Sequence, residues 1–256
     1  MNNNPQNERL LIDEMSADMT IYLEPNLLKE EYQHLMDTSK IDVEAIKKYR
    51  QLLSNVKYAW QKVVRYKVFF AEFYTETDTI DDVEALNHHI HAYLQDLDTL
   101  KNKIMHMLGE LRKDVKAIAS NKDDVEDFVE AAKQKTLKVF DGALKHRRSH
   151  VHNGMRFMDG ELLKAENAHE AIKMATEGLL AEMMNPEYRD KWVEELKVEK
   201  AESLEKAKSH WVEMATNNDV QTTGYLETFL GFVRPSLNQF LGITPMFELI
   251  GKEKHE

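Results

Sequence analysis

The chain has 256 residues, of which 42% are apolar and 31% are charged, and its formal net charge is −11. This charge argues against a protein that coats nucleic acid through a broad basic surface, and the absence of cysteine excludes a disulfide framework, a thiolate metal site and a cysteine nucleophile. No apolar run approaches the roughly 18 residues that cross a bilayer, and residues 1–14 have neither the basic flank nor the apolar stretch of a signal peptide. We therefore expect a cytoplasmic protein that does not bind membranes.

Two long helices are predicted over residues 42–75 and 80–119, after one or two short helices in residues 1–41 that break at Pro25. In both long segments apolar residues recur at every third or fourth position, which is the spacing of a buried helix face. These positions include Ile46, Tyr49, Leu53, Val56 and Trp60 in the first segment and Leu86, Ile90, Tyr93, Leu97 and Leu100 in the second.

Capping residues mark where the next helices begin and end. Thr79 and Asp82 have the spacing of a capping box before the second long helix. A third helix is predicted over residues 122–152. It is expected to end at Asn153 and Gly154, because glycine tolerates the left-handed conformation of a helix C-cap.

Three more helices are predicted in the second half of the chain. They cover about residues 158–184, which are rich in Met, residues 187–216, which carry a strongly charged face, and residues 220–241, which are rich in aromatics. The Met and aromatic side chains most simply form core or an interface with a partner helix. Residues 242–256 are expected to fray.

No segment shows the alternation of apolar and polar residues that is typical of a strand. We therefore predict an all-α fold, an antiparallel bundle of long helices with short connections. Residues 1–41 would form an N-terminal group of short helices and residues 42–185 the main bundle. Residues 186–256 would form a C-terminal helical extension packed on the same domain.

The densest group of chemically active side chains lies between Lys145 and His152, at the end of the third predicted helix. Six of these eight residues are basic or titratable. Imidazole both accepts and donates a proton near neutral pH, and guanidinium supplies permanent charge and paired donors for a phosphate. Cleavage of a phosphodiester without a metal needs a base for the 2′-hydroxyl, an acid for the leaving oxygen and a cation for the developing charge.

Arg147 and His152, with four residues between them, resemble the signature of the HEPN superfamily, an Arg followed after four to six residues by a His near the end of an inner helix. The resemblance covers about residues 80–180. It implies a metal-independent endoribonuclease, usually a homodimer whose two motifs face one cleft. Arg147 would bind or polarise the scissile phosphate and His152 would be the acid–base group. Many members are toxins, act in antiphage defence or work beside a nucleotidyltransferase-like partner.

Helix geometry adds Arg148 and His150 to the candidate site. Positions five apart on a helix point about 140° apart, so Arg147 and His152 share a site only if the arginine reaches round or the helix distorts. Arg148 and His152 lie on one face, which makes Arg148 a second candidate for the phosphate. His150 is a candidate second proton donor.

Two other interpretations remain open. Basic residues in the last turn of a helix interact favourably with its negative end, so the cluster is alternatively a helix cap or binding patch of a non-catalytic interaction or nucleotide-binding protein. The third interpretation is a ferritin-like di-iron protein. Glu31 and His34, and likewise Glu166 and His169, have the spacing of iron ligands in such bundles, and Glu72 is a further candidate.

A histidine-rich stretch, His88, His89 and His91 with Glu84, more simply forms a solvated or half-buried polar face than a metal site. The chain has no Gly-rich phosphate loop and no dinucleotide-binding unit, so we expect neither a cofactor nor a bound metal. The leading interpretation is a HEPN-type ribonuclease that acts on RNA as a homodimer, with an antitoxin or a nucleotidyltransferase-like protein as a candidate partner.

Overall fold

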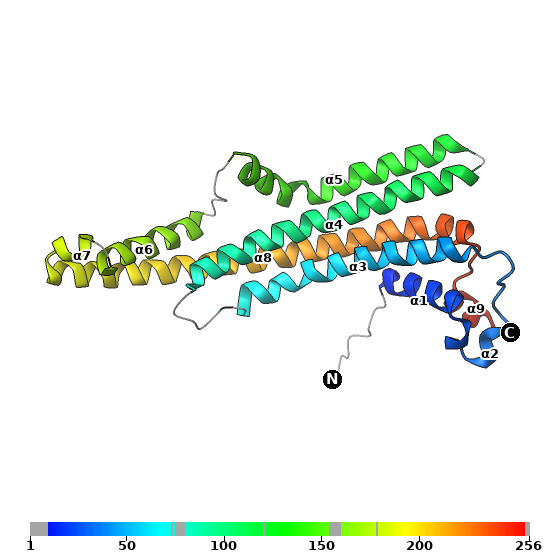
Figure 1. Cartoon of the computed structure of the whole chain (residues 1–256), viewed down its shortest axis with the longest axis horizontal. Coiled ribbons are helices and arrows are strands. Elements are labelled where there is room, and N and C mark those ends of the chain that lie inside the picture. The colour runs from blue at the N-terminus through cyan, green and yellow to red at the C-terminus, as the bar shows by residue number, and fades with distance from the viewer. Residues whose placement is uncertain are drawn as a thin grey trace. The chain divides into compact units, whose positions relative to one another are not determined.

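The structure is a computed structural model that describes residues 10–72, 74, 80–119, 121–153, 160–177 and 179–253, without the side chains of residues 143–153, 179–180, 247 and 251–253. Every element in these residues is a helix (Figure 1), which confirms the predicted all-α fold. None of the described helices combines the length and the apolar character that a bilayer-spanning segment requires.

The chain folds into two compact units, each built from segments that are distant in the sequence. Residues 1–61, 99–140 and 221–256 form the first unit, and residues 62–98 and 141–220 form the second. The predicted main bundle and the predicted C-terminal extension both contribute segments to each unit.

The first unit is a helical bundle with short helices at one end. Its elements are α1 (Leu11–Leu23), the 3₁₀ turn η1 (Pro25–Leu27), α2 (Glu30–Gln33), the first part of α3 (Val43–Glu72), the second part of α4 (Asp82–Ile118), most of α5 (Lys122–Asn153), the end of α8 (Pro186–Leu241) and α9 (Met246–Glu253). The prediction of short helices with a break at Pro25 is confirmed. The predicted ends of α3, α4 and α5 lie within about three residues of the observed ones.

The core of the first unit is formed by the apolar faces that the sequence predicted. Tyr49 of α3 is fully buried and meets Phe240 of α8 edge to face, with ring centroids 5.9 Å apart. Trp60 of α3 donates from its indole Nε1 to the hydroxyl of Thr223 on α8 at 3.0 Å. Burial of such rings is the main favourable term in folding, and the polar bond fixes how the two helices align.

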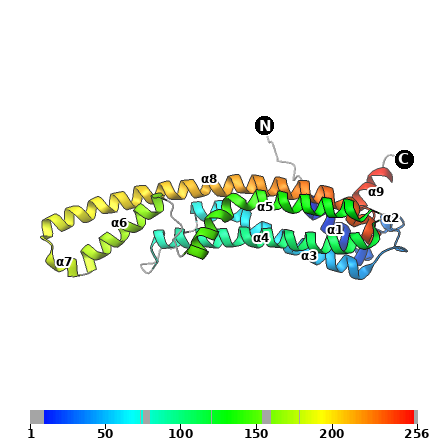
Figure 2. The same cartoon turned by 90° about the horizontal axis from the view of Figure 1, so that it is seen from above.

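The second unit is held together by a cluster of aromatic rings. Phe70 of α3 lies 5.5 Å from Tyr93 of α4 and 5.7 Å from Trp211 of α8, measured between ring centroids, and all three are buried. Beside α8 runs α6 (Gly160–Glu177), with α7 (Leu179–Met183) at the turn between them (Figure 2). Of the single helix predicted over about residues 158–184, the structure describes residues 160–177 and 179–183 as helical, and residue 178 lies outside the described residues.

The prediction of separate helices over residues 187–216 and 220–241 is wrong, because α8 is one helix of 56 residues. The polar residues between the two segments favoured a break, since Asn and Asp are poor helix formers. In the folded chain these side chains contact neighbouring helices instead. Asn218 donates to the hydroxyl of Tyr93 at 2.8 Å, and Asp219 pairs with Lys67 at 2.7 Å. Tertiary contacts thus override local propensity here.

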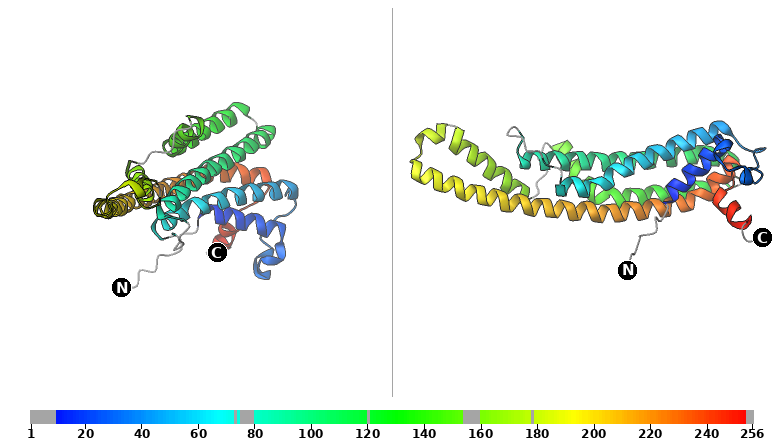
Figure 3. Two further views of the ribbon diagram at one scale, coloured as in Figure 1. Left: turned by 60° about the vertical axis from the view of Figure 1, so that its left-hand side comes forward. Right: turned by 90° about the horizontal axis from the view of Figure 1, so that it is seen from below.

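The prediction that residues 242–256 fray is also wrong for most of this segment, which forms α9 beside α1 (Figure 3). Tyr22 of α1 binds the loop before α9. Its hydroxyl donates to the carbonyl of Thr244 and accepts from the N–H of Thr244, both at 3.1 Å. A buried phenol that binds both backbone polar groups of one residue holds that residue in place.

The helix start of α4 differs from the predicted capping box of Thr79 and Asp82, of which Thr79 lies outside the described residues. Asp81 is the N-cap, and its carboxylate accepts from the N–H of Val83 at 2.8 Å. Glu84 reaches back to the N–H of Asp81 at 3.4 Å. The reciprocal pair is therefore Asp81 and Glu84, with the Glu that a capping box normally has.

Candidate functional site

The predicted catalytic cluster lies in the last turns of α5, which is described through Asn153. Gly154 of the predicted helix stop lies outside the described residues. The side chains of Arg147, Arg148, His150 and His152 lie outside the described residues, and the structure gives their helical backbone alone. In a regular helix positions 148 and 152 are about one turn apart, whereas positions 147 and 152 point roughly 140° apart. The backbone therefore puts position 148, more than position 147, on the helix face of position 152.

The part of α5 before this cluster is fixed to α8 within the first unit. Thr136, which is fully buried, forms a hydrogen bond with the hydroxyl of Tyr225 and also donates to the carbonyl of Ala132 at 2.7 Å. Phe140 is only 1% exposed. Position 147 follows Phe140 by about two turns, so the cluster begins beyond these two anchors.

The Glu-x-x-His pair of α6 contacts other polar groups of the second unit. Glu166 accepts a hydrogen bond from the amide of Asn87 at 2.9 Å. The Nδ1 atom of His169 lies 3.5 Å from the carboxylate of Asp81 and 3.3 Å from the ammonium of Lys200. A lysine beside an imidazole nitrogen is unfavourable for a metal cation, because it places a positive charge at the ligand atom.

The di-iron interpretation finds no ligand cluster in the described part of the chain. No group of three or more His, Asp or Glu side chains there is arranged to hold a metal ion. Glu31, His34 and Glu72 are all exposed. Carboxylates of a di-iron site would instead project into the interior of a bundle.

The histidine-rich stretch of α4 forms the half-buried polar face that the sequence predicted. His88 is exposed, whereas His89 and His91 are partly buried. His89 stacks on Phe69, with ring centroids 6.2 Å apart. These contacts are those of a structural face.

Asp81 of the second unit has several polar partners. Besides capping α4, its carboxylate binds the ammonium of Lys200. Burial by itself would raise the pKa of Asp81. The hydrogen bonds from Lys200 and the N–H of Val83, with the charge of Lys200, outweigh burial and hold that pKa below its ordinary value. The carboxylate of Asp81 thus links the start of α4 to His169 of α6 and to Lys200 of α8.

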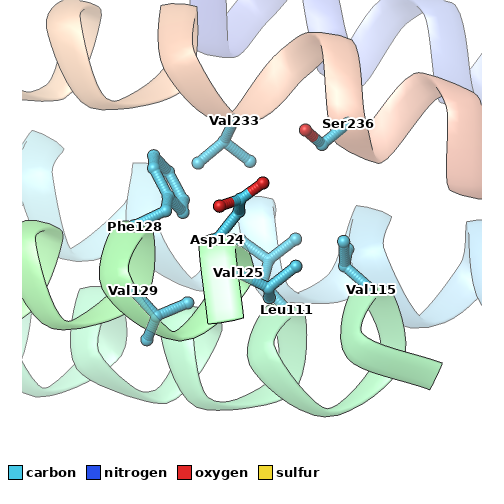
Figure 4. A pocket seen from close by; sticks show the side chains of 8 residues that line it. All are labelled: Leu111, Val115, Asp124, Val125, Phe128, Val129, Val233 and Ser236. Atoms are coloured by element: carbon cyan, nitrogen blue, oxygen red, sulfur yellow. The ribbon is translucent and has the colours of Figure 1, made fainter. Parts of the chain in front are cut away.

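A second candidate surface is an apolar cavity of about 280 Å³ in the first unit, between α4, α5 and α8 (Figure 4). Its walls include Leu111 and Val115 of α4, Val125, Phe128 and Val129 of α5, and Val233 of α8. The carboxylate of Asp124 and the hydroxyl of Ser236 are the polar groups at its edge. An apolar cavity with few polar groups is typical of a binding site.

Next to this cavity lies another of about 220 Å³, which shares Phe128 with the first. It lies between α5 and α8, and its walls include Ala132, Tyr225, Phe229 and Phe232, with Lys135 at its edge. Phe128 is 37% exposed and Phe232 is 68% exposed. We call the two cavities together the α5–α8 groove.

Sequence reasoning predicted the apolar residues of this groove but not the groove itself. Residues 122–152 were predicted as a helix, and the aromatics of residues 220–241 indicated core or an interface. Which of the two applies depends on how α5 pairs with α8, because Phe229 is buried whereas Phe232 is open to solvent. The many aromatic residues between positions 220 and 241 are the signal in the sequence.

No family model matches the sequence, and no curated protein and no solved structure is similar to the chain. Functional inference therefore rests on the residues of this chain alone.

Proposed function

We propose that the chain is a metal-independent endoribonuclease of HEPN type. The observation that carries this proposal is the position of Arg147, Arg148 and His152 in the final turns of a long helix that ends at Asn153. A phosphate can approach such a helix end if several cations offset the negative end of the helix dipole.

The chemistry follows from the two residue types. A neutral imidazole at His152 takes the proton of the 2′-hydroxyl, whose oxygen attacks the adjacent phosphorus and forms a 2′,3′-cyclic phosphate. The bond to the 5′-oxygen breaks, and a protonated imidazole, His150 or a His152 of a second copy, gives that oxygen its proton. The guanidinium of Arg148 or Arg147 binds the non-bridging oxygens and stabilises their additional charge.

A homodimer with two clusters at one cleft would reconcile this chemistry with a net charge of −11. Global charge sets non-specific affinity for RNA, whereas the site needs only local positive charge. An acidic exterior would also restrict cleavage to RNA that reaches the cleft. Such an enzyme would act in the cytoplasm as a toxin or in antiphage defence, with an antitoxin or a nucleotidyltransferase-like protein as its partner.

The experiment is cleavage of structured RNA by the purified protein in EDTA. Variants His152→Ala, Arg147→Ala and Arg148→Ala are compared with His88→Ala, which changes an exposed histidine outside the cluster. We expect cleavage to survive EDTA, to follow a bell-shaped pH profile and to fall at least about 100-fold in His152→Ala. The larger loss among the two arginine variants identifies the phosphate ligand. Cleavage that His152→Ala leaves intact would refute the assignment.

The alternative is a non-catalytic binding protein in which the cluster caps α5, and the position of the cluster at the helix end favours it as well. Cations in the last turn stabilise a helix by about 0.3–1 kcal/mol each. On this alternative His152→Ala lowers the melting temperature while the protein cleaves no RNA before or after the change. Thermal unfolding of the variants above therefore separates the two functions.

A further inference from the structure

The α5–α8 groove is long enough for a helix. Along α5 it extends from Asp124 to Lys135, which are eleven residues or about 16 Å apart along the helix axis. On α8 it extends from Tyr225 to Ser236 over the same number of residues. Both walls present residues three or four positions apart, which is the pattern that an amphipathic helix meets when it lies in a groove.

The charged side chains near the α8 wall of the groove already have partners within the chain. Residues 221–242 contain two charged side chains, Glu227 and Arg234. Both bind α1, since Glu227 accepts from the N–H of Leu11 at 3.0 Å and Arg234 contacts Glu14 at 3.2 Å. Phe232 is 68% exposed on a stretch of helix with only these two charges, in a chain of which 31% is charged. Such a stretch is typical of a protein interface.

The α5 wall is charged and polarised. Asp124 lies at one end and Lys135 at the other, and both are exposed. Among the described residues neither the carboxylate of Asp124 nor the ammonium of Lys135 has an ion-pair or hydrogen-bond partner. In Figure 4 the carboxylate of Asp124 is directed over the apolar cavity, between Phe128 and Ser236. The groove thus has an acidic and a basic end about three turns apart.

We propose that the α5–α8 groove binds one amphipathic helix of a different protein. The apolar face of this helix packs on Phe128 and Phe232. A basic residue of the helix faces Asp124, and an acidic residue about eleven positions along faces Lys135. A partner helix of mixed charge fits these ends. The proposal is independent of the ribonuclease activity.

Binding of designed helical peptides to the full chain tests this inference. Three labelled 18-residue peptides share one Leu-rich face and differ at two flanking positions eleven residues apart. The mixed peptide has Lys and Glu there, the acidic peptide has two Glu and the basic peptide has two Lys. We expect fluorescence anisotropy at low salt to show that wild type binds the mixed peptide about fivefold tighter than either other peptide. This preference should shrink in 0.5 M salt, roughly the condition that screens exposed charges.

Charge-reversed variants of the groove should change the preference in a defined way. Asp124→Lys makes both ends basic and should favour the acidic peptide, and Lys135→Glu should favour the basic peptide. Phe232→Ser should weaken the binding of all three peptides at least about tenfold. Val198→Ser, at a position of α8 that is 58% exposed and lies in the second unit, should weaken none of them.

Three outcomes would overturn the proposal. One is equal affinity for the three peptides. Another is binding that Phe232→Ser leaves intact in a protein with a wild-type circular dichroism spectrum. The third is self-association in sedimentation that Phe232→Ser abolishes, which would make a second copy the occupant of the groove.

Discussion

The carboxylate of Asp18 on α1 accepts a hydrogen bond of 3.0 Å from the backbone N–H of Met246, the first residue of α9. In the same unit, Glu227 of α8 accepts from the N–H of Leu11, the first residue of α1. Each carboxylate satisfies a backbone donor that a helix start leaves open. Side chains from elsewhere in the sequence thus cap both short helices.

The Asp18 cap leads to a prediction about pH. Burial raises the pKa of Asp18, against the opposing effects of the Met246 N–H bond and the charge of Arg234. A raised pKa means that the folded protein loses stability through this group as pH rises from about 3.8 through the raised value. We expect Asp18→Asn to become more stable relative to wild type over this range, because Asn keeps an acceptor without the buried charge.

Urea unfolding of wild type and Asp18→Asn between pH 3.5 and roughly 7 measures this difference. Asp18→Ala is the companion variant, and it should be destabilised by about 1–3 kcal/mol at every pH because the Met246 N–H then loses its acceptor. A gap between Asp18→Asn and wild type that does not change with pH would contradict the assigned charge of Asp18.

A close approach of two backbone segments predicts that Gly242 is irreplaceable. Gly242 has φ of +68°, and a Cβ atom there would lie 2.4 Å from the carbonyl oxygen of Lys40. We expect Gly242→Ala to destabilise the protein by about 2 kcal/mol or more, from strain in φ and from the clash. Gly109→Ala is the control, because its Cβ would meet nothing within 4 Å in the middle of α4. That change should stabilise the protein by about 0.5–1 kcal/mol.

Gly242→Ala should lower the melting temperature and Gly109→Ala should raise it, so thermal unfolding of the two variants tests the prediction. Equal melting temperatures for Gly242→Ala and Gly109→Ala would show that the loop before α9 does not pack on Lys40.

How far the fold follows from the sequence depends on whether a signal is local. The apolar spacing of α3 and α4 and the Asn153–Gly154 stop are local, and these helices were predicted to within about three residues. The continuity of α8 depends on Tyr93 and Lys67, and the formation of α9 depends on Asp18 and Tyr22, all of them distant in the sequence. No local pattern encodes those partners.

The candidate sites divide in the same way. The basic cluster is visible in the sequence because its residues are neighbours along one helix. The α5–α8 groove needs the pairing of two helices about 100 residues apart, and the sequence predicts only that residues 122–152 and the aromatic-rich residues 220–241 are helical. The contacts of His169 with Lys200 and Asp81 likewise follow only from how three elements meet.

Asp81 provides a prediction for the second unit. Removing its carboxylate takes away both the cap of α4 and the partner of Lys200, so Asp81→Ala should be destabilised by about 1–3 kcal/mol. Asp82→Ala is the matched control, because Asp82 is one residue away, 42% exposed and 3.7 Å from Lys208. A surface pair of this kind contributes about 1 kcal/mol at most.

The pKa of Asp81 is lowered, so its contribution to stability should be present above about pH 3.8 and lost as pH falls through the lowered value. The gap in unfolding free energy between wild type and Asp81→Asn should therefore stay constant above that pH and shrink below it. A gap that persists in acid would show that the negative charge of Asp81 is not what stabilises this site.

The continuity of α8 through residues 217–219, between the two helices that were predicted separately, depends on contacts with other helices. Asn218 donates to the hydroxyl of Tyr93 at 2.8 Å, and burial raises the pKa of that phenol to about 12, so it stays protonated and available. Alanine is the better helix former by about 0.5 kcal/mol, yet Asn218→Ala should lose about 1 kcal/mol because the buried hydroxyl loses its donor. Asn217→Ala, at the exposed neighbouring position, should only gain from propensity. Hydrogen exchange should show amides 216–221 of wild type as protected as the adjoining turns, with protection reduced in Asn218→Ala alone. If both alanine variants gained stability equally, propensity rather than the contact with Tyr93 would decide whether α8 continues through this junction.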